Sequence, residues 1–308
     1  MRLSPTDYFG SPKSDLPPQR PIASRTMIGY KSAKHGDKRV VVTLEIPEDA
    51  LTNMGRSKVA AKETAKYCAN KANVLKIEDD EGNCYPTATS FNYREKTLEY
   101  KVGEVMEEPS YNPQEVCAEG IHFFLSRRVA ELYGMEKVAN GLFEMWYENG
   151  QKGEEVPYVN GQRHGLRETW FGNGQKSEEL EYVYGKMYGL YRSWYENGQK
   201  DVETTFVDGQ RHGLYQSWHE NGQKMDEIPY VNGQRHGLYQ RWYRNGQKTE
   251  EIEYVYGKIH GLYRTWYENG QKWEECVFVN GEKHGLYQRW DNDGNKLVEK
   301  TYVNGVPQ

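Results

Sequence analysis

Residues 178–200 read EELEYVYGKMYGLYRSWYENGQK, and residues 250–272 repeat them at 19 of 23 positions. Likewise, PYVNGQRHGL at 157–166 recurs unchanged at 229–238, so both pairs of segments are offset by 72 residues. A shorter period of 24 residues lies beneath this offset, marked by seven tryptophans: Trp146, Trp170, Trp194, Trp218, Trp242, Trp266 and Trp290. The pattern therefore predicts seven repeat units, with a block of three units duplicated.

Each unit is predicted to form two short strands joined by turns. A glycine lies five positions before each repeat tryptophan, and an Asn-Gly pair (Asp-Gly in the last unit) follows it. A further glycine closes the unit, as in Gly185 and Gly209. Asn-Gly between alternating aromatic runs indicates a β-hairpin with a type I′ turn, because both central residues of that turn need positive φ. No window keeps a helical period, so we expect an elongated antiparallel β-meander.

Strand alternation assigns the side chains of each unit to two faces. On this basis Leu190, Arg192 and Trp194 share one face, whereas Tyr191, Ser193 and Tyr195 share the other. Recurrent Gln-Lys and Glu-Glu pairs are expected to place opposite charges on neighbouring strands. Solvated cross-strand ion pairs explain them most simply, and a charged stripe for a partner is the alternative.

Composition excludes several classes of protein. The chain has 308 residues, 36% of them hydrophobic and a net charge of -5, and its mean hydropathy is -0.96. These values lean toward disorder, but 13% aromatic residues argue against it, and the repeat places these rings at regular positions. We expect neither a membrane-spanning segment nor a secretory signal. The acidic balance disfavours nucleic acid, and the four cysteines suggest reduced thiols.

Three regions are predicted: a Pro-rich extended arm over 1–25, a small α/β domain over 26–134, and the repeats over 135–308. In the middle region 38–46 (KRVVVTLEI), 74–77 and 98–105 are expected strands, and 80–83 a turn. Residues 60–71 (AAKETAKYCANK) are expected to be helical, and Ser126 to cap a helix through Tyr133. Residues 121–125 are expected to be buried.

Candidate chemistry in the repeats is weighed against simple structural roles. A histidine ladder suggests a metal site or proton relay: His164, His212, His236, His260 and His284. Equivalent positions lie about 10 Å apart, too far to share one metal, so turn-flanking roles are favoured. Core packing is favoured for the aromatic ladders, with ligand stacking as the alternative. Partner-binding candidates on this aromatic repeat face are the seven repeat tryptophans with Tyr191, Tyr215, Tyr239, Tyr263 and Tyr287.

Residues 26–134 offer weaker candidates. Cys117 and His122 suggest a nucleophile with its base, although buried structural roles are favoured. Lys58, Lys62 and Lys66 would share a helical face near Arg56, as a solvated face or an anion patch. The glycines Gly29, Gly36 and Gly55 form no phosphate-binding motif. No catalytic, cofactor-binding or metal residue is predicted.

Tyr147–Lys152 and Trp194–Lys200 carry the pattern G-x-[WY]-Y-x-N-G-Q-K, so the repeats resemble the variant MORN repeat, a β-hairpin unit. This resemblance covers 139–308 and implies scaffolding or, less securely, lipid contact. Variant MORN repeats also occur in bacterial proteins labelled as YwqK-type antitoxins. Residues 117–124 (CAEGIHFF), 130–133 and 44–50 resemble a domain found beside such repeats in large DNA viruses of amoebae, particularly marseilleviruses.

We therefore expect a non-enzymatic interaction or structural scaffold without cofactors. The resemblance suggests a virion-associated component that binds capsid or other virion proteins, located in the virion or in the cytoplasm of the infected cell. The alternatives are an antitoxin-like or host-factor-binding protein and an enzyme housed in 26–134. Membrane contact is disfavoured by the acidic repeats, nucleic acid is not expected, and self-association remains open.

Overall fold

A computed structural model describes residues 26–308 except 58, 92–96, 113–119 and 136. The described chain divides into two compact units. The described residues before 137, with Glu144–Gly153, form the first unit, and Lys137–Phe143 with Glu154–Gln308 form the second. The expected arm over 1–25 and Cys117 lie outside the described residues.

The first unit is built around an eight-stranded sheet. Its strands run in the order β3-β8-β1-β2-β4-β7, and β5 pairs with both β1 and β6. The strands are β1 (Met27–His35), β2 (Lys38–Ile46), β3 (Lys66–Ala69), β4 (Lys71–Glu78), β5 (Thr87–Ser90), β6 (Glu99–Lys101), β7 (Val105–Glu107) and β8 (Ile121–Phe124). The strands expected over 38–46 and 74–77 are thus confirmed.

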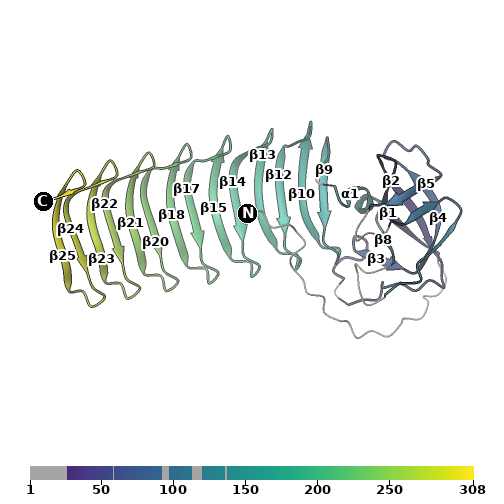
Figure 1. Ribbon diagram of the computed structural model, residues 1–308, viewed down its shortest axis with the longest axis horizontal. Coiled ribbons are helices and arrows are strands. Elements are labelled where there is room, and N and C mark those ends of the chain that lie inside the picture. Colours follow the sequence, from purple (N-terminus) through teal and green to yellow (C-terminus); the bar gives the residue numbers. More distant parts are fainter. Residues whose placement is uncertain (1–25, 58, 92–96, 113–119, 136) are drawn as a thin grey trace. The chain divides into compact units, whose positions relative to one another are not determined.

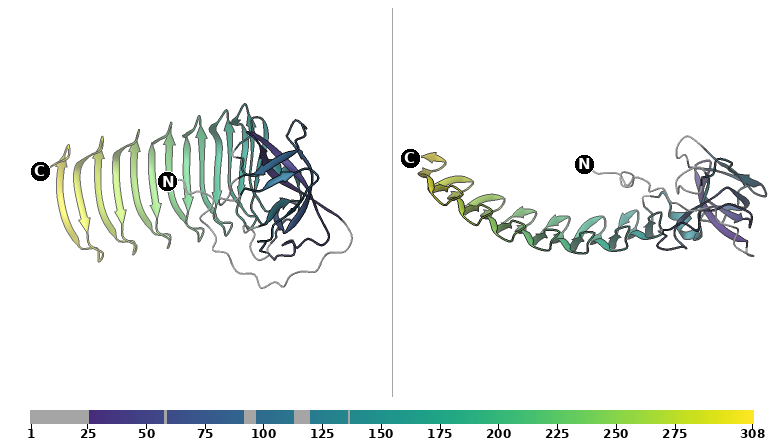
Figure 2. Two further views of the ribbon diagram at one scale, coloured as in Figure 1. Left: turned by 45° about the vertical axis from the view of Figure 1, so that its right-hand side comes forward. Right: turned by 90° about the horizontal axis from the view of Figure 1, so that it is seen from below.

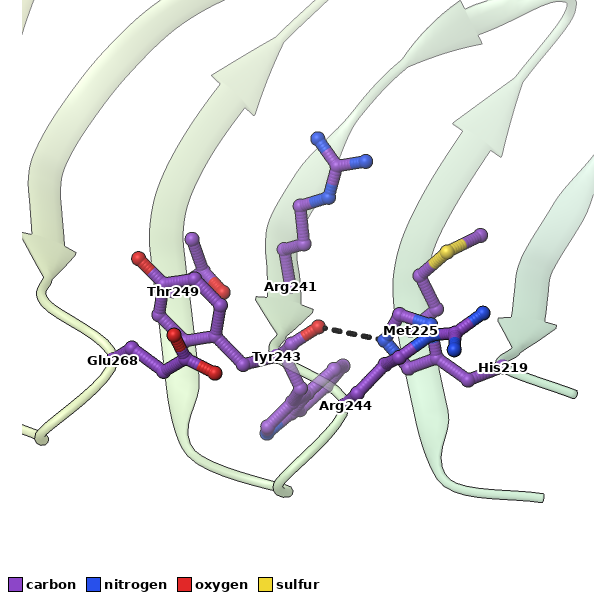
Figure 3. A pocket seen from close by; sticks show the side chains of 8 residues that line it. His219, Met225, Arg241, Tyr243, Arg244, Thr249 and Glu268 are labelled. Atoms are coloured by element: carbon purple, nitrogen blue, oxygen red, sulfur yellow. Dashed lines mark hydrogen bonds between the residues drawn. The ribbon is translucent and has the colours of Figure 1, made fainter. Parts of the chain in front are cut away.

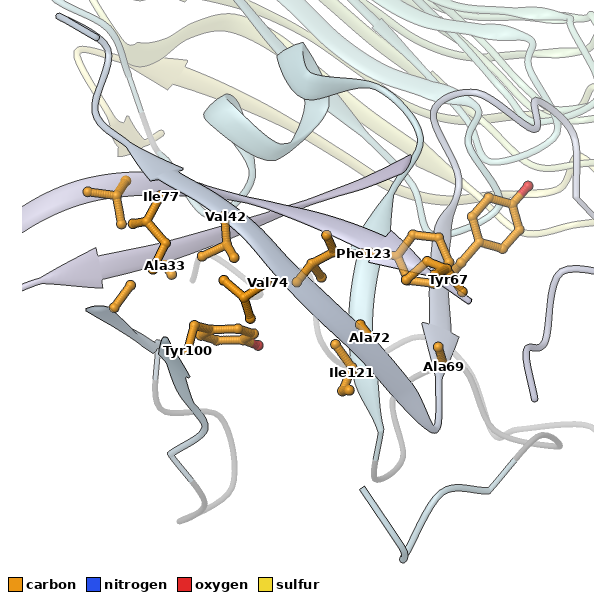
Figure 4. Close-up of a cluster of buried hydrophobic side chains, with 14 of the residues drawn as sticks. Ala33, Val42, Tyr67, Ala69, Ala72, Val74, Ile77, Tyr100, Ile121 and Phe123 are labelled. Atoms are coloured by element: carbon orange, nitrogen blue, oxygen red, sulfur yellow. The ribbon is translucent and has the colours of Figure 1, made fainter. Parts of the chain in front are cut away.

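The larger hydrophobic cluster of this unit is drawn in Figure 4, and a smaller one that includes Val41 and Phe124 packs on the opposite face of the sheet. Strand β2 contributes Val40, Val42 and Leu44, alternate residues that are almost completely buried. Ile121 and Phe123 of β8 are also inaccessible, as expected for that segment. The expected turn over 80–83 forms beyond β4, where the buried Asp79 accepts main-chain hydrogen bonds from Glu81 and Asn83.

The helix expected over 60–71 is wrong. Residues 62–64 form a turn, and Lys66–Ala69 form β3, which pairs with β8. Alanine and lysine favour helices intrinsically, but pairing with a buried strand outweighs that local preference. The unit is consequently a β domain with one short helix among its described residues, α1 (Arg127–Leu132). The predicted cap of this helix is confirmed, because the Ser126 hydroxyl accepts from the Val129 amide.

The strand expected over 98–105 is interrupted. Strand β6 ends at Lys101, and β7 begins at Val105. Between them Gly103 adopts a φ of +85° and donates its amide to the Val74 carbonyl at 2.8 Å. The left-handed glycine turns the chain from β5 toward β4, so one predicted strand becomes two strands with different neighbours.

The repeats form a long antiparallel meander in which successive hairpins lie side by side (Figure 1). Seen from below in Figure 2, the same hairpins follow one another in a single layer. The first strands are β9 (Gly141–Trp146), β10 (Lys152–Val159), β11 (Gln162–Arg163), β12 (Gly165–Trp170), β13 (Lys176–Val183), β14 (Lys186–Trp194) and β15 (Lys200–Val207). The next are β16 (Gln210–Arg211), β17 (Gly213–Trp218), β18 (Lys224–Val231), β19 (Gln234–Arg235), β20 (Gly237–Trp242) and β21 (Lys248–Val255). The last are β22 (Lys258–Trp266), β23 (Lys272–Val279), β24 (Glu282–Trp290), β25 (Lys296–Val303) and β26 (Val306–Pro307). The predicted meander is confirmed.

Two kinds of turn alternate along the meander. The turn that closes each unit is type I′: Asn232 and Gly233 have φ values of 49° and 78°. The Asn-Gly pair after each tryptophan behaves differently, because Gly198 has a φ of +83° but Asn197 does not have positive φ. Gly198 donates to the Tyr195 carbonyl at 2.9 Å, and Tyr195 donates to the Gln199 carbonyl at 2.8 Å. This is a three-residue loop with a bulge at glycine, so the type I′ expectation is wrong here.

Candidate interaction surfaces of the repeat sheet

The strand register separates the repeat side chains into two faces. Arg192 lies opposite Glu203, and Tyr191 lies opposite Thr204. Directly paired residues of antiparallel strands share a face, and neighbours along a strand alternate. We call the side that carries Leu190, Arg192 and the repeat tryptophans the Trp face, and the side that carries Tyr191 and its equivalents the Tyr face. This matches the predicted alternation.

The Tyr face carries the compact packing of the repeats. Ile228 and Ile252 are 6% and 5% exposed and pack with Tyr239, which is also buried. Edge-on aromatic pairs repeat along this side, with ring centroids of Tyr239 and Tyr254 6.3 Å apart. Burial, with the nearby Glu178 carboxylate, raises the pKa of Tyr191 to about 12. These tyrosines therefore stabilise the sheet as neutral, half-buried rings.

The Trp face carries a chain of ion pairs. Arg192 contacts Glu179 at 2.7 Å and Glu203 at 3.1 Å, so one guanidinium bridges two units. Arg264 joins Glu251 and Glu275 in the same way, three units further along. The pairing expected for the Gln-Lys lysines is confirmed only in part: Lys152 and Lys176 reach Glu144 and Glu168 on the neighbouring strand, whereas lysines such as Lys248 contact a glutamate three residues along their own strand.

Each lysine of the Gln-Lys pair serves two partners on this face. The ammonium of Lys200 contacts Glu203 at 2.8 Å and lies 4.9 Å from the ring centroid of Trp218 in the next unit. Lys176, Lys224, Lys248 and Lys272 lie over the following tryptophan in the same manner. The tryptophans are thus half-buried beneath cations rather than open for stacking.

The predicted partner-binding residues do not form one surface. Trp194, Trp218 and their equivalents lie on the Trp face, whereas Tyr191, Tyr215, Tyr239, Tyr263 and Tyr287 lie on the Tyr face. Grouping them as one aromatic face was wrong, because residues an odd number of positions apart on a strand point to opposite sides. Only one of the two sets can face a given partner.

The histidine ladder caps the type I′ turns. The Nδ1 atom of His236 accepts a hydrogen bond of 3.4 Å from the Tyr256 amide in the next unit, and the two rings lie 4.7 Å apart. His164, His212 and His260 bind the amides of Tyr184, Asn232 and Asn280 equivalently. In the first repeat, Asn140 takes the place of the histidine, and its side-chain oxygen accepts a hydrogen bond from the Asn160 amide. Four of the five histidines therefore have the favoured turn-flanking role, whereas the buried Nδ1 atom of His284 has no hydrogen-bond partner among the described residues.

A ladder of asparagine side chains links the opposite turns, and the sequence reasoning missed it. The Nδ2 atom of Asn221 donates to the Arg244 carbonyl at 3.1 Å, and its Oδ1 atom accepts from the Gln223 amide at 3.1 Å. Asn173, Asn197, Asn245 and Asn269 repeat both bonds. The asparagine before glycine, present in six of the seven repeats, was the available signal, but it was used only to predict the conformation of the turn.

One shallow hollow of about 370 Å³ lies near this edge of the sheet (Figure 3). His219 replaces the usual tyrosine here, and its Nε2 atom lies 3.2 Å from the Trp242 carbonyl. Arg241 and Arg244 replace a small hydroxyl residue and a glutamate of neighbouring units. Arg241 lies 3.4 Å from the Asp226 carboxylate, so its charge is compensated. The hollow is open to solvent, and its lining mixes aromatic side chains with His219, Arg244 and Glu268.

The candidate residues of the amino-terminal unit have structural roles. His122 lies directly opposite Cys68 on β3, and Cys68 is completely buried. Lys66 belongs to β3 and is 8% exposed, so the expected lysine face on a helix is wrong. Gly29 lies against Phe123, where a Cβ atom would approach its ring to 2.5 Å, which accounts for that glycine by packing. In the described ranges no group of acidic, histidine and cysteine side chains is arranged to hold a metal.

Six stretches of the chain match a family model: residues 139–160, 187–208, 211–232, 235–256, 259–280 and 283–304. That model describes the MORN repeat variant. The repeat around Trp170 falls outside the matches, but β12 and β13 pair like the strands of the other repeats. Residues 17–130 match a family of unknown function, DUF5758. No curated protein matches the chain.

MORN repeats point to an interaction or structural role for the second unit. Helix α1 is far too short to cross a membrane, and the described part of the chain holds no helix that is long and apolar enough to do so.

Proposed function

We propose that this protein is a non-enzymatic scaffold that binds an extended protein partner along its repeat sheet. The observation that carries the proposal is repetition on an exposed single-layer sheet. Equivalent units present lysine, glutamate and leucine at the same positions. The residue opposite the leucine on the paired strand differs from unit to unit. A surface of this kind offers many similar contacts in a row, which suits a long partner better than a small substrate.

The absence of catalysis is part of the proposal. An active site needs a nucleophile or base beside convergent polar groups. The described residues of the first unit place Cys68 in the interior, beside His122 on a paired strand. The hollow on the repeats is shallow, and Arg241, one of its two arginines, is ion-paired with Asp226. Both observations support a binding role.

Cross-linking of the full chain to proteins of its source cells tests the scaffold role. The lysines from Lys152 to Lys296 recur once in every unit, so an amine-reactive cross-linker samples the whole Trp face. A scaffold predicts one partner cross-linked to several consecutive units. Cross-links confined to residues 26–135 would contradict the proposal.

The two more specific roles that the resemblance suggests make different predictions. A virion-associated component, bound to capsid or other virion proteins, predicts that the protein is found in purified virions by mass spectrometry. An antitoxin-like or host-factor-binding protein predicts a tight one-to-one complex with a non-virion protein. Of the two we favour the virion component, because long repeat surfaces suit assemblies of many equivalent subunits. Absence from purified virions would reject it.

A further inference from the structure

An exposed apolar stripe runs along the repeat sheet and is not used by the packing described above. Six of the seven repeat leucines are 36–49% exposed, and six of the seven valines before the type I′ turns are 36–44% exposed. The leucines are Leu142, Leu166, Leu190, Leu214, Leu238 and Leu286; the valines are Val159, Val183, Val207, Val255, Val279 and Val303. We call these residues the Leu–Val stripe. Contiguous exposed apolar surface of this kind marks interaction sites.

The stripe lies on the Trp face, between the ion pairs and the type I′ turns. Leu190 lies opposite Thr205, and Val207 follows Thr205 by two positions on the same strand, so it points to the same face. Leu214 lies opposite Pro229 in the next unit. The stripe is therefore only about two side chains wide, with charged residues along one flank. A narrow occupant fits it better than a second sheet.

The histidine ladder adds a hydrogen-bond donor beside the stripe in units that carry a histidine, five of the seven. The Nδ1 atoms of His212 and His260 accept from main-chain amides, so these nitrogens carry no proton. A neutral imidazole then carries its proton on Nε2. Both histidines are exposed, and the described residues supply no partner for this N–H. A unit such as that of His212 and Leu214 consequently presents an apolar leucine and a donor in a fixed relation.

The spacing of the units selects the conformation of the occupant. Neighbouring strands lie about 4.8 Å apart, so equivalent residues recur about every 9.6 Å. A polyproline II helix repeats every three residues, about 9.3 Å, and leaves its carbonyl groups free to accept hydrogen bonds. An α-helical heptad advances about 10.5 Å, and an extended strand shows one face about every 6.7 Å. Polyproline II alone keeps register over several units.

The negative charge of the repeats favours a basic occupant of the stripe. Residues 135–308 carry 21 basic and 26 acidic residues, a balance of 21 − 26 = -5. Glu181 and Glu253 interrupt the stripe itself, each in the place that proline, threonine or valine takes in other units. Basic side chains on the occupant would meet these carboxylates, whereas acidic ones would be repelled.

We propose that the Leu–Val stripe binds a proline-rich, basic segment of a partner protein in the polyproline II conformation. Every third residue of the segment would contact one leucine, and its carbonyls would accept from the histidine Nε2–H groups. This inference rests on the proposed scaffold role, since it names the partner chemistry for one face. Partners cross-linked to the repeats but lacking such a segment would reject this inference alone.

Fluorescence anisotropy with the full chain tests it, using a labelled (Pro-Pro-Lys)₇ peptide as probe. The flexible (Gly-Ser-Lys)₇ peptide has the same charge, and (Pro-Pro-Glu)₇ has the opposite charge. We expect (Pro-Pro-Lys)₇ to bind about tenfold more tightly than either. Equal binding of (Gly-Ser-Lys)₇ would show attraction by charge alone and would overturn the proposal, as would the absence of binding at about 1 mM.

Variants place the binding on the stripe. Leu214→Ser combined with Leu238→Ser removes two neighbouring contacts and is expected to weaken (Pro-Pro-Lys)₇ binding about tenfold. Leu297→Ser is the matched control, because Leu297 is 55% exposed but lies outside the stripe. His236→Phe keeps an aromatic ring but removes the donor, and should weaken binding less. Equal losses for Leu297→Ser and the double variant, with unchanged melting curves, would reject the assignment.

Discussion

The side-chain amide of Asn197 donates a hydrogen bond of 3.0 Å to the main-chain carbonyl of Glu220, in the turn of the next unit. The same asparagine accepts from the amide of Gln199 at 2.9 Å. One residue thus fixes its own turn and joins it to the following one. Because the bond recurs from unit to unit, the stability of the array should be a sum of similar junctions.

Replacing an asparagine in the middle of this ladder should loosen one junction. Asn221→Ala removes both the bond to Arg244 and the bond within the turn, and we expect a loss of about 1–2 kcal/mol in the free energy of unfolding. Asn221→Asp is the matched variant, since it keeps the acceptor and removes only the donor. Its loss in urea denaturation should be smaller, and an equal loss would refute the role of the donated bond.

The type I′ turns should depend on glycine for conformation alone. Gly209 has a φ of +82°, and a Cβ atom placed on it would meet nothing within 4 Å. Gly209→Ala should therefore cost about 1–2 kcal/mol through backbone strain. At Gly172, which also has open space around it and no positive φ, the same substitution should be neutral or slightly stabilising. Similar melting temperatures for the two variants would contradict this explanation.

Acid should weaken the Trp face. Hydrogen bonds from Lys200 and Lys248, opposed by burial and aided by Arg192 and Arg264, lower the pKa of Glu203 and Glu251 below the ordinary 4.5. Carboxylates with lowered pKa stabilise the fold above the unfolded pKa, and this contribution is lost as pH falls through the folded value. The melting temperature should thus fall as pH drops below about 4.5. The double variant Glu203→Gln, Glu251→Gln should show a shallower fall; an identical slope would argue against these pairs.

The sequence predicted the repeats well because their signals are local. Trp194 and Gly198 recur at fixed spacing, and alternation along residues 189–195 assigned both faces. Two errors had the same cause. The segment 60–71 has helical propensity, but its partners are distant: Ala60 and Ala61 donate to the Asn149 carbonyl. The conformation of Asn197-Gly198 likewise depends on bonds across the turn, which composition does not encode.

The candidate site was predicted in part. Tyrosines and tryptophans stood out by their number, so the less conspicuous leucines were left aside. In the fold Lys200 covers Trp218, and Tyr239 packs against Ile228, whereas Leu214 remains 42% exposed. Exposure of a side chain depends on its neighbours in adjacent strands, and that information is absent from a single repeat unit.

Deletion of residues 187–258 tests the central claim, that function resides in the length of the repeat sheet. The deletion removes 72 residues, three whole units, and joins Lys186 to Ile259 in the same repeat phase. We predict that the shortened chain folds with unchanged turn chemistry and that its affinity for the partner identified by cross-linking falls about tenfold or more. Unchanged affinity of a folded deletion variant would contradict the claim and would place binding outside the repeats.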